Sequence, residues 1–353
     1  MARPNHITRA IIDATVDRGI REIAEDPNRS IRKLADMGRE FSKGRFMSDV
    51  YDLFQDLLRN DDSPYYNVIS QLLRTTDFQT LKTFGINFGY DGLTFGGKTI
   101  RSLSETTDFR IPWILSFEYA PRQANAITLS EIGDCIRQGQ DLGIYIYTIN
   151  ISGKPDKSDE PELIRLCREN SECAFLFFMP DDIVSETAAE KFSSSGNAMF
   201  LFRSSGDATP HNVDLFRSHK LLLGIYELYD DDTAESCLNG SMIRRMSSYG
   251  AAFGMLISSI GCSSRTEKKA VRYIRNVRTH PEYPLILFGI PSDVSHIGIT
   301  ISGDDANLTL LSNGDIHTYD RIISDFRHTT SLEQLFRIAF PRQKKADASN
   351  SES

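Results

Sequence analysis

The chain has 353 residues, of which 40% are hydrophobic and 25% are charged, as is usual for a globular protein with a sizeable core. Its formal net charge of −8 disfavours nucleic acid as the main partner, because phosphate binding needs a basic surface. The longest apolar runs, such as 221–226, are too short to cross a bilayer, and the first residues show no signal-type segment. We therefore expect a cytoplasmic protein that binds neither nucleic acid nor a membrane.

The first ninety residues show the spacing of short amphipathic helices. Ile12, Val16, Ile20 and Ile23 form one apolar stripe. Similar stripes occupy 31–41, 47–57 and 68–73, the first of them after a capping serine, Ser30. The glycines between positions 85 and 97 match no nucleotide-binding fingerprint, so we expect a connector with tight turns.

From Pro112 onwards, strand-like runs alternate with amphipathic helical stretches. We expect strands at 113–117, 144–151, 174–179, 198–202, 221–227 and 253–258, with 285–290 as a further candidate. Helices are expected at 129–138, 161–169, 184–192, 234–249 and 267–277. This alternation predicts an α/β fold, specifically a partial (β/α) TIM-like barrel of about six strands.

The last part of the chain predicts short strands, a turn and one helix. Strands are expected at 297–301 and 308–311, a hairpin turn at Asn313-Gly314, and a helix at 332–340. We therefore divide the chain into a helical region with a glycine-rich connector (1–109), the barrel (110–291), the C-terminal hairpin and helix (292–341), and a disordered polar tail (342–353).

Several segments, in this order, are similar to one group of bacterial radical S-adenosylmethionine proteins. They are 25–34, 111–115, 127–148, 162–167, the hairpin at 308–316 and the closing helix that begins near 331. The resemblance implies a barrel in which three cysteines, on the loop after the first strand, hold a four-iron cluster that binds S-adenosylmethionine.

This sequence departs from the family at the positions that carry the chemistry. The loop between Phe117 and Ile127 is short and contains neither Cys nor His. Ser152 and Lys154 stand where the family has a Gly-Gly-Glu-Pro loop that meets the cosubstrate ammonium group, while Gly153 is retained. The hairpin also lacks the cysteine that often follows its turn. We therefore expect no iron–sulfur cluster and no cofactor, with cluster-free binding of S-adenosylmethionine as a weaker alternative.

The five cysteines are widely separated and form no Cys-x-x-Cys pair, which indicates reduced, mostly buried thiols. They are Cys135, Cys167, Cys173, Cys237 and Cys262. We therefore expect no metal site.

Six residues are candidates for a vestigial pocket at the barrel mouth. They are Glu118, Tyr119, Ser152, Gly153, Lys154 and Glu227. Glu227 ends a predicted strand and could act as an acid or base if desolvated, or serve structure alone. The run 230–232 could bind a divalent ion, but carboxylates at this place more often cap a helix.

The sequence thus predicts a non-catalytic, radical S-adenosylmethionine-like pseudoenzyme. It would act as a binding or partner subunit, for a peptide or protein substrate or for an active paralogue with an intact cluster. The alternative is a cluster-independent enzyme or small-molecule binder that uses the barrel mouth, with Glu118, Tyr119, Lys154 and Glu227 in one pocket.

Overall fold

A computed structural model describes residues 6–23, 32, 33, 58, 63–153, 159–319, 321–324 and 331–342. The strands are β1 (Ile114–Tyr119), β2 (Ile146–Ile151), β3 (Ala174–Phe178), β4 (Ala198–Arg203), β5 (Leu223–Tyr229), β6 (Phe253–Ser258), β7 (Ile286–Gly289), β8 (Leu308–Leu310), β9 (Ile316–Thr318) and β10 (Ile322–Ile323). All ten belong to one sheet, in the order β10-β9-β8-β1-β2-β3-β4-β5-β6-β7.

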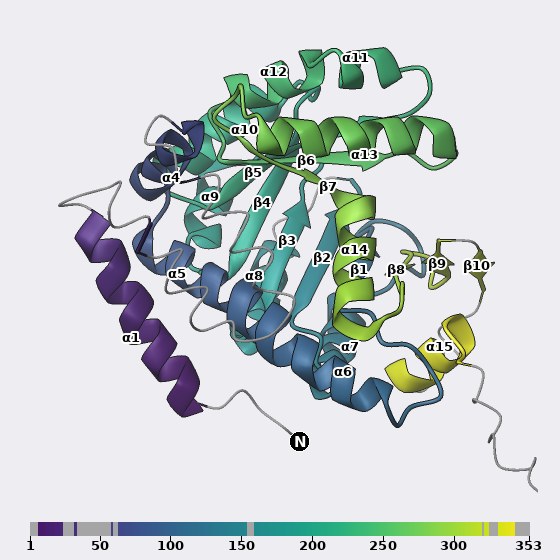
Figure 1. Cartoon of the computed structure of the whole chain (residues 1–353). Coiled ribbons are helices and arrows are strands. Elements are labelled where there is room, and N and C mark those ends of the chain that lie inside the picture. Colours follow the sequence, from purple (N-terminus) through teal and green to yellow (C-terminus); the bar gives the residue numbers. More distant parts are fainter. Residues whose placement is uncertain are drawn as a thin grey trace, which may run out of the picture.

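The eight strands from β1 to β8 run parallel to one another. Each strand from β1 to β6 pairs with its successor, and β8 pairs with the other edge of β1. Within the described residues β7 and β10 are the two edges, so the sheet is open (Figure 1). The predicted α/β partial barrel is therefore confirmed. The candidate strand near 285–290 forms as β7, and β8 adds an eighth parallel strand.

In the part of the chain that the structure describes, seven helices follow or connect the strands between β1 and β7. They are α7 (Leu129–Asp141), α8 (Asp159–Glu169), α9 (Glu186–Phe192), α10 (Thr209–Ser218), α11 (Ala234–Leu238), α12 (Ser241–Ser248) and α13 (Ser264–Thr279). The single helix predicted at 234–249 is wrong. Gly240 has φ +81°, a left-handed conformation that ends α11 before α12 begins.

One side of the sheet packs on these helices through a row of aromatic rings. Adjacent ring centroids along the row lie 5.5 to 6.3 Å apart, and the row consists of Phe117, Tyr147, Phe175, Phe177 and Phe200. Phe200 and Phe202 also contact Phe216 of α10. Because strand side chains alternate between faces, the intervening positions, such as Glu118 and Tyr226, face the opposite side, which we call the concave face.

The glycine-rich segment is helical, so the predicted connector with tight turns is wrong. α5 (Phe78–Ile86), η1 (a π-helix, Asn87–Gly96) and α6 (Gly97–Ser104) form one continuous long helix (Figure 1). A Cβ atom on Gly92 would lie 2.5 Å from Cδ1 of Ile146, and one on Gly96 would collide with the carbonyl oxygen of Gly143. These glycines therefore allow close packing of the helix against the start of β2.

The long helix crosses the amino-terminal ends of the parallel strands. The Asn87 amide donates to the carbonyls of Ser171 and Cys173, just before β3, at 2.8 Å each. At the amino-terminal end of the helix, the backbone N–H of Asp77 donates to the carbonyl of Lys220, just before β5. This end of the barrel is therefore covered by the long helix.

Two of the four predicted N-terminal helices lie in the described residues. α1 (His6–Ile23) and α4 (Pro64–Thr75) confirm the first and the fourth; Ser63 caps α4 by accepting from the N–H of Tyr65. The other two predictions, within 30–57, lie outside the described residues apart from 32 and 33. Among the described residues, no helix combines the length and apolarity needed to span a membrane.

The C-terminal region contains one wrong prediction and two confirmed ones. Residues 297–301 belong to α14 (Ile290–Ser302), a helix, and not to a strand. Pro291 at its first turn and Gly303 at its end, with φ +76°, bound the helix, and Trp113 Nε1 donates to the carbonyl of Val294 at 2.9 Å. The β8–β9 hairpin and α15 (Leu332–Ala339) form as expected. The tail beyond 342 lies outside the described residues.

Candidate functional site

The carboxyl-terminal ends of parallel strands meet at one end of a barrel, where functional residues usually gather. At this end the loop from β1 to α7 is a compact turn. Gln123 N–H donates to the carbonyl of Ala120, and Ala126 N–H donates to the carbonyl of Gln123. Some of the backbone N–H and carbonyl groups of this loop are therefore hydrogen-bonded within the loop itself.

The same loop is bound to the β8–β9 hairpin through one carboxylate and one hydroxyl. Glu118 Oε2 accepts from the backbone N–H of Ser312 at 3.2 Å and from its hydroxyl at 3.4 Å. The Ser312 hydroxyl lies 2.9 Å from Gln123 Oε1, and the Ile127 N–H donates to the Ser312 carbonyl at 2.8 Å. Glu118 thus serves to join the loop to the hairpin.

Three further candidates lie around the end of β1 and β2. The Tyr119 hydroxyl donates to Asp159 of α8 at 2.7 Å, on the helix side of the sheet. The Ser152 N–H donates to the Tyr119 carbonyl at 2.9 Å. Gly153 has φ +84°, so a turn follows β2 as the retained glycine suggested. Lys154 lies outside the described residues.

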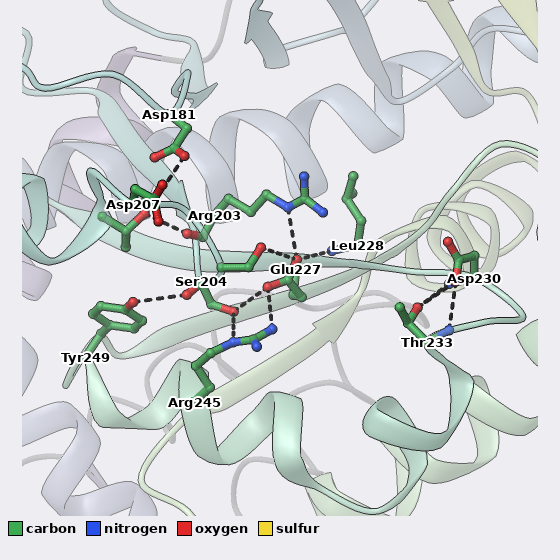
Figure 2. Close-up of polar contacts among 12 residues, drawn as sticks. Asp181, Arg203, Ser204, Asp207, Glu227, Leu228, Asp230, Thr233, Arg245 and Tyr249 are labelled. Carbon is green, nitrogen blue, oxygen red and sulfur yellow. Dashed lines mark hydrogen bonds and ion pairs between the residues drawn. The ribbon is translucent and has the colours of Figure 1, made fainter.

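Among the described residues at this end of the barrel, Glu227 accepts five hydrogen bonds (Figure 2). Its side chain is 2% exposed. Oε1 accepts from Arg203 Nε at 3.0 Å, from the Ser205 hydroxyl at 3.1 Å and from the Leu228 N–H at 3.1 Å. Oε2 accepts from the Ser204 hydroxyl at 2.6 Å and from a terminal nitrogen of Arg245 at 2.7 Å.

This network keeps Glu227 ionised. Burial alone raises the pKa of a carboxyl group, but the hydrogen bonds from Ser204, Arg203, the Leu228 N–H and Ser205 outweigh it, so the pKa of Glu227 lies below its ordinary value. A carboxylate with this many donors is a poor general base, because its lone pairs are already occupied.

The network joins three elements that the sequence separates. Arg203 is the last residue of β4 and Ser204 and Ser205 follow it, Glu227 is near the end of β5, and Arg245 lies on α12. Tyr249, just after α12, donates its hydroxyl to the Ser204 carbonyl at 3.0 Å. Parallel pairing of Arg203 with Tyr226 could have placed the β4 end beside Glu227, but no sequence signal marks Arg245.

A second carboxylate organises the neighbouring loop. Asp181 accepts from the backbone N–H groups of Asp207 and Ala208 at 3.0 and 2.9 Å, just before α10 (Figure 2). Asp230 accepts from the N–H of Thr233 at 2.8 Å, at the start of α11. This bond closes a turn just before α11, whose N-cap residue, Thr233, makes no side-chain capping bond, so the capping role that the sequence favoured for this run stays a prediction.

The described candidate residues do not form one cluster. Glu118 contacts the C-terminal hairpin, Tyr119 contacts α8, and Glu227 contacts the β4 end and α12. Among the described residues no group of three or more His, Cys, Asp or Glu side chains is arranged to hold a metal ion.

The thiols do not fit a cluster of the radical S-adenosylmethionine type. All five lie in described segments, and four of them are buried: Cys135, Cys167, Cys173 and Cys237. Burial raises the pKa of Cys135 to about 12 and that of Cys237 to about 11, and it raises the other two as well. Cluster ligation needs thiolates, and none of these residues belongs to the loop after β1.

The fold and these contacts define an open parallel α/β barrel with an arginine–carboxylate network at its carboxyl-terminal end. No protein-family model and no curated protein matches the chain. Solved structures with a similar fold include SuiB from Streptococcus suis bound to the precursor peptide SuiA. That comparison has 12% identity and a TM-score of 0.48, and it covers 67% of this chain and 66% of SuiB.

Two further structures illustrate the range of the similarity. Methylornithine synthase (PylB) has 12% identity and a TM-score of 0.40, with 89% of this chain and 98% of that chain covered. 3-Dehydroquinate dehydratase from Geobacillus kaustophilus HTA426 has 14% identity and a TM-score of 0.35. This comparison covers 52% of this chain and 74% of that chain. The chain spans about three fifths of SuiB in its complex with S-adenosylmethionine, where 59% is covered. At these identities the likeness concerns the fold and assigns no ligand or activity to this chain.

Proposed function

We propose that this protein is a non-catalytic, radical S-adenosylmethionine-like subunit that binds a peptide or protein partner. The observation that carries the proposal is the loop after β1. In the family that the sequence resembles, this loop holds the cluster cysteines. Here Glu118 and Ser312 bind the loop to the C-terminal hairpin, and the sequence supplies no thiol between Phe117 and Ile127.

The proposal is supported by the contrast between the thiols, which could not ligate a cluster, and the sheet, which is well packed. The thiols that remain are scattered, and four of them are buried with raised pKa values. The sheet, by contrast, keeps its eight parallel strands and a continuous core from Phe84 to Phe340. A barrel that retains its packing without cluster ligands is suited to binding, and an active paralogue could supply the chemistry.

The concave face offers a surface for such a partner. Phe178 and Tyr226 lie there in an edge-to-face contact, with ring centroids 5.1 Å apart, and both are only half-buried. Thr148 donates to the Ser116 hydroxyl at 2.8 Å on the same face, and these two side chains are also half-buried. Half-buried rings and hydroxyl groups on one face can take apolar side chains together with polar backbone groups.

Anaerobic reconstitution with iron and sulfide tests the proposal. We expect no stoichiometric four-iron cluster by metal analysis and by visible absorbance. A Cys262→Ser variant serves as the control for adventitious iron, because Cys262 is the one thiol among the five that is partly exposed. Uptake of about four irons per chain that persists in this variant would contradict the proposal.

Thermal-shift titration with S-adenosylmethionine tests the cluster-free alternative. A ligand that binds only the folded state raises the melting temperature, and the rise grows with the logarithm of the ligand concentration once that concentration exceeds the dissociation constant. We expect no rise at millimolar S-adenosylmethionine. A rise that increases with the S-adenosylmethionine concentration would favour a small-molecule site at the barrel mouth over the partner-subunit proposal.

A further inference from the structure

The outward-facing side of α13 carries a row of basic residues. α13 lies on the outside of the fold, where it contacts β7 and α11 (Figure 1). At 3.6 residues per turn, the members of the row fall within an arc of about 120° around the helix axis. All of them are exposed, and we call them the basic stripe: Arg265, Lys268, Lys269, Arg272 and Arg275. The opposite side of the helix buries Ala270 and Ile274.

Among the described residues, no carboxylate is paired with the basic stripe. None of its five members forms an ion pair or a side-chain hydrogen bond with another described residue. Glu267, the acidic residue of α13, is half-buried and, by the same periodicity, lies on the side of Ile274. Asp231 accepts from the Ser263 hydroxyl at 2.6 Å, at the start of the helix.

Two further carboxylates near α13 interact with arginines outside the basic stripe. Asp293 forms an ion pair with Arg278. Glu282 is close enough to Arg244 of α12 to interact with it electrostatically. Even if Glu282 and the two carboxylates named above each offset one charge, the basic stripe stays positive.

The basic stripe lowers the stability of its own helix. Its members are spaced by three or four residues, so like charges are neighbours on the helix surface, and such pairs are destabilising. Arg265 also lies in the first turn, where the helix dipole favours a negative charge. The whole chain has a net charge of −8, so this concentration of positive charge is local. A costly local arrangement of this kind is typical of a functional surface.

We propose that the basic stripe of α13 binds an acidic segment of the protein partner. The inference rests on the proposed function, because it names the chemistry of the partner surface that touches α13. Opposite charges arranged along two surfaces speed up association, fix the relative orientation of the partners and disfavour partners of the wrong charge. A run of Asp or Glu side chains supplies the complementary charge, and arginine guanidinium groups can bind its carboxylates through paired N–H donors.

The size and composition of the basic stripe favour a protein segment over a nucleic acid or a membrane. From Arg265 to Arg275 the stripe extends about 15 Å along the helix axis, the length of about five extended residues. A nucleic acid or a bilayer reaches well beyond this length and would meet the rest of a chain that is negatively charged overall. The exposed side of α13 also lacks an aromatic ring for base stacking and an apolar side chain for insertion into lipid.

Fluorescence anisotropy on the full chain tests this inference. The probe is a fluorescein-labelled, C-terminally amidated hexaglutamate peptide, and its match is the hexaglutamine peptide. In about 50 mM sodium chloride we expect hexaglutamate to bind about tenfold or more tightly than hexaglutamine, and about 300 mM salt should remove most of this preference. The double change Lys268→Gln and Arg272→Gln should weaken hexaglutamate binding about fivefold.

The matched control is the double change Arg165→Gln and Arg168→Gln on α8, which removes the same charge from two exposed arginines of another helix. It should leave hexaglutamate binding within about twofold of the wild type. Lys268→Arg combined with Arg272→Lys keeps both charges and should also preserve binding. Urea unfolding checks the fold of the glutamine variant, because removal of like charges from α13 should leave the unfolding midpoint unchanged or raise it.

Equal affinity for the two peptides, no binding of hexaglutamate, or an equal loss in the α8 and α13 double variants would overturn the inference. Tighter binding of a fluorescein-labelled hexauridylate RNA, or cosedimentation with phosphatidylserine vesicles, would also overturn it, because the basic stripe would then serve another class of ligand. Reconstitution with iron and sulfide does not involve α13. A chain that takes up no cluster and shows no preference for hexaglutamate would therefore keep the proposed function and lose only this inference.

Discussion

Arg9 of α1 forms an ion pair with Asp91, whose side chain is completely buried in η1. Arg9 also donates to Asn87 Oδ1 at 2.8 Å, and burial lowers the pKa of Arg9. A second contact joins α1 to the α5 part of the long helix. Here Lys82 Nζ lies 3.1 Å from Asp13 Oδ2 and 3.3 Å from Asp17 Oδ1. Charged groups therefore help to hold α1 on the long helix.

Replacement of Arg9 by Met should destabilise the fold strongly. The change leaves the Asp91 carboxylate buried without its cation, so the free energy of unfolding should fall by about 3 kcal/mol in urea denaturation. Addition of Asp91→Asn should recover part of this loss. Arg18→Met is the control, because Arg18 is 80% exposed and its pair with Glu22 lies at the surface, where it should contribute little. Equal effects of the two arginine changes would contradict this account of α1.

The two glycines Gly96 and Gly89 of η1 should respond differently to alanine. A Cβ on Gly96 would collide with the Gly143 carbonyl, whereas nothing lies within 4 Å of a Cβ on Gly89. We expect Gly96→Ala to lower the free energy of unfolding by about 2 kcal/mol or more, and Gly89→Ala to leave it unchanged or raise it by about 0.5 kcal/mol. Thermal and urea unfolding measure both. A tolerated Gly96→Ala would mean that the helix does not pack this closely on β2.

The contribution of Glu227 to stability should depend on pH. Its pKa in the folded state lies below the ordinary value of 4.5, so its stabilisation is complete above that value and is lost as the pH falls through the folded pKa. Glu227→Gln should cost about 2 kcal/mol at pH 7, and the difference from the wild type should shrink below pH 4.5.

Urea denaturation at several pH values measures this dependence. Glu162→Gln is the control, since Glu162 is 51% exposed and lies 3.8 Å from Arg165. Its effect should stay below about 0.5 kcal/mol at every pH. If Glu227→Gln lowered the free energy of unfolding by the same amount at every pH, the loss would come from altered packing and not from the ionised contacts.

The link between Ser312 and the loop after β1 should protect that loop from proteolysis. Ser312→Ala removes the hydroxyl contacts to Glu118 and Gln123 and keeps the backbone contact. We expect faster trypsin cleavage after the exposed Arg122, because local opening of the loop costs less. Ser248→Ala on α12 is the control, and it should leave the cleavage rate at Arg122 unchanged. Mass spectrometry of the fragments locates the cut.

The sequence predicted the parallel strands well because each is a short apolar run between turn residues. It failed at Gly92 and Gly96, since glycine favours turns locally, while here the absence of a side chain permits contact with Ile146 and Gly143. It failed at 297–301 for the opposite reason. β-branched residues favour a strand there, but Pro291, Gly303 and the contact with Trp113 fix a helix.

The candidate site was only partly predictable. Glu227 was visible as a carboxylate at a strand end, and the short loop near Glu118 was visible as missing cysteines. Arg245 was not, because it reaches Glu227 only after the helix break at Gly240 redirects α12. Contacts of this kind depend on tertiary packing, which residue spacing does not encode.

The pairing of β8 with the outer edge of β1 has a consequence for biosynthesis. Glu118 and Ser312, which meet beside this pair, are 194 residues apart, so β1 leaves the ribosome long before its partner exists. Until Leu308–Leu310 has been translated, the backbone groups of β1 on that edge remain open to other chains. Nascent chains that stall or terminate before β8 should therefore depend on chaperones and aggregate through β1 in their absence.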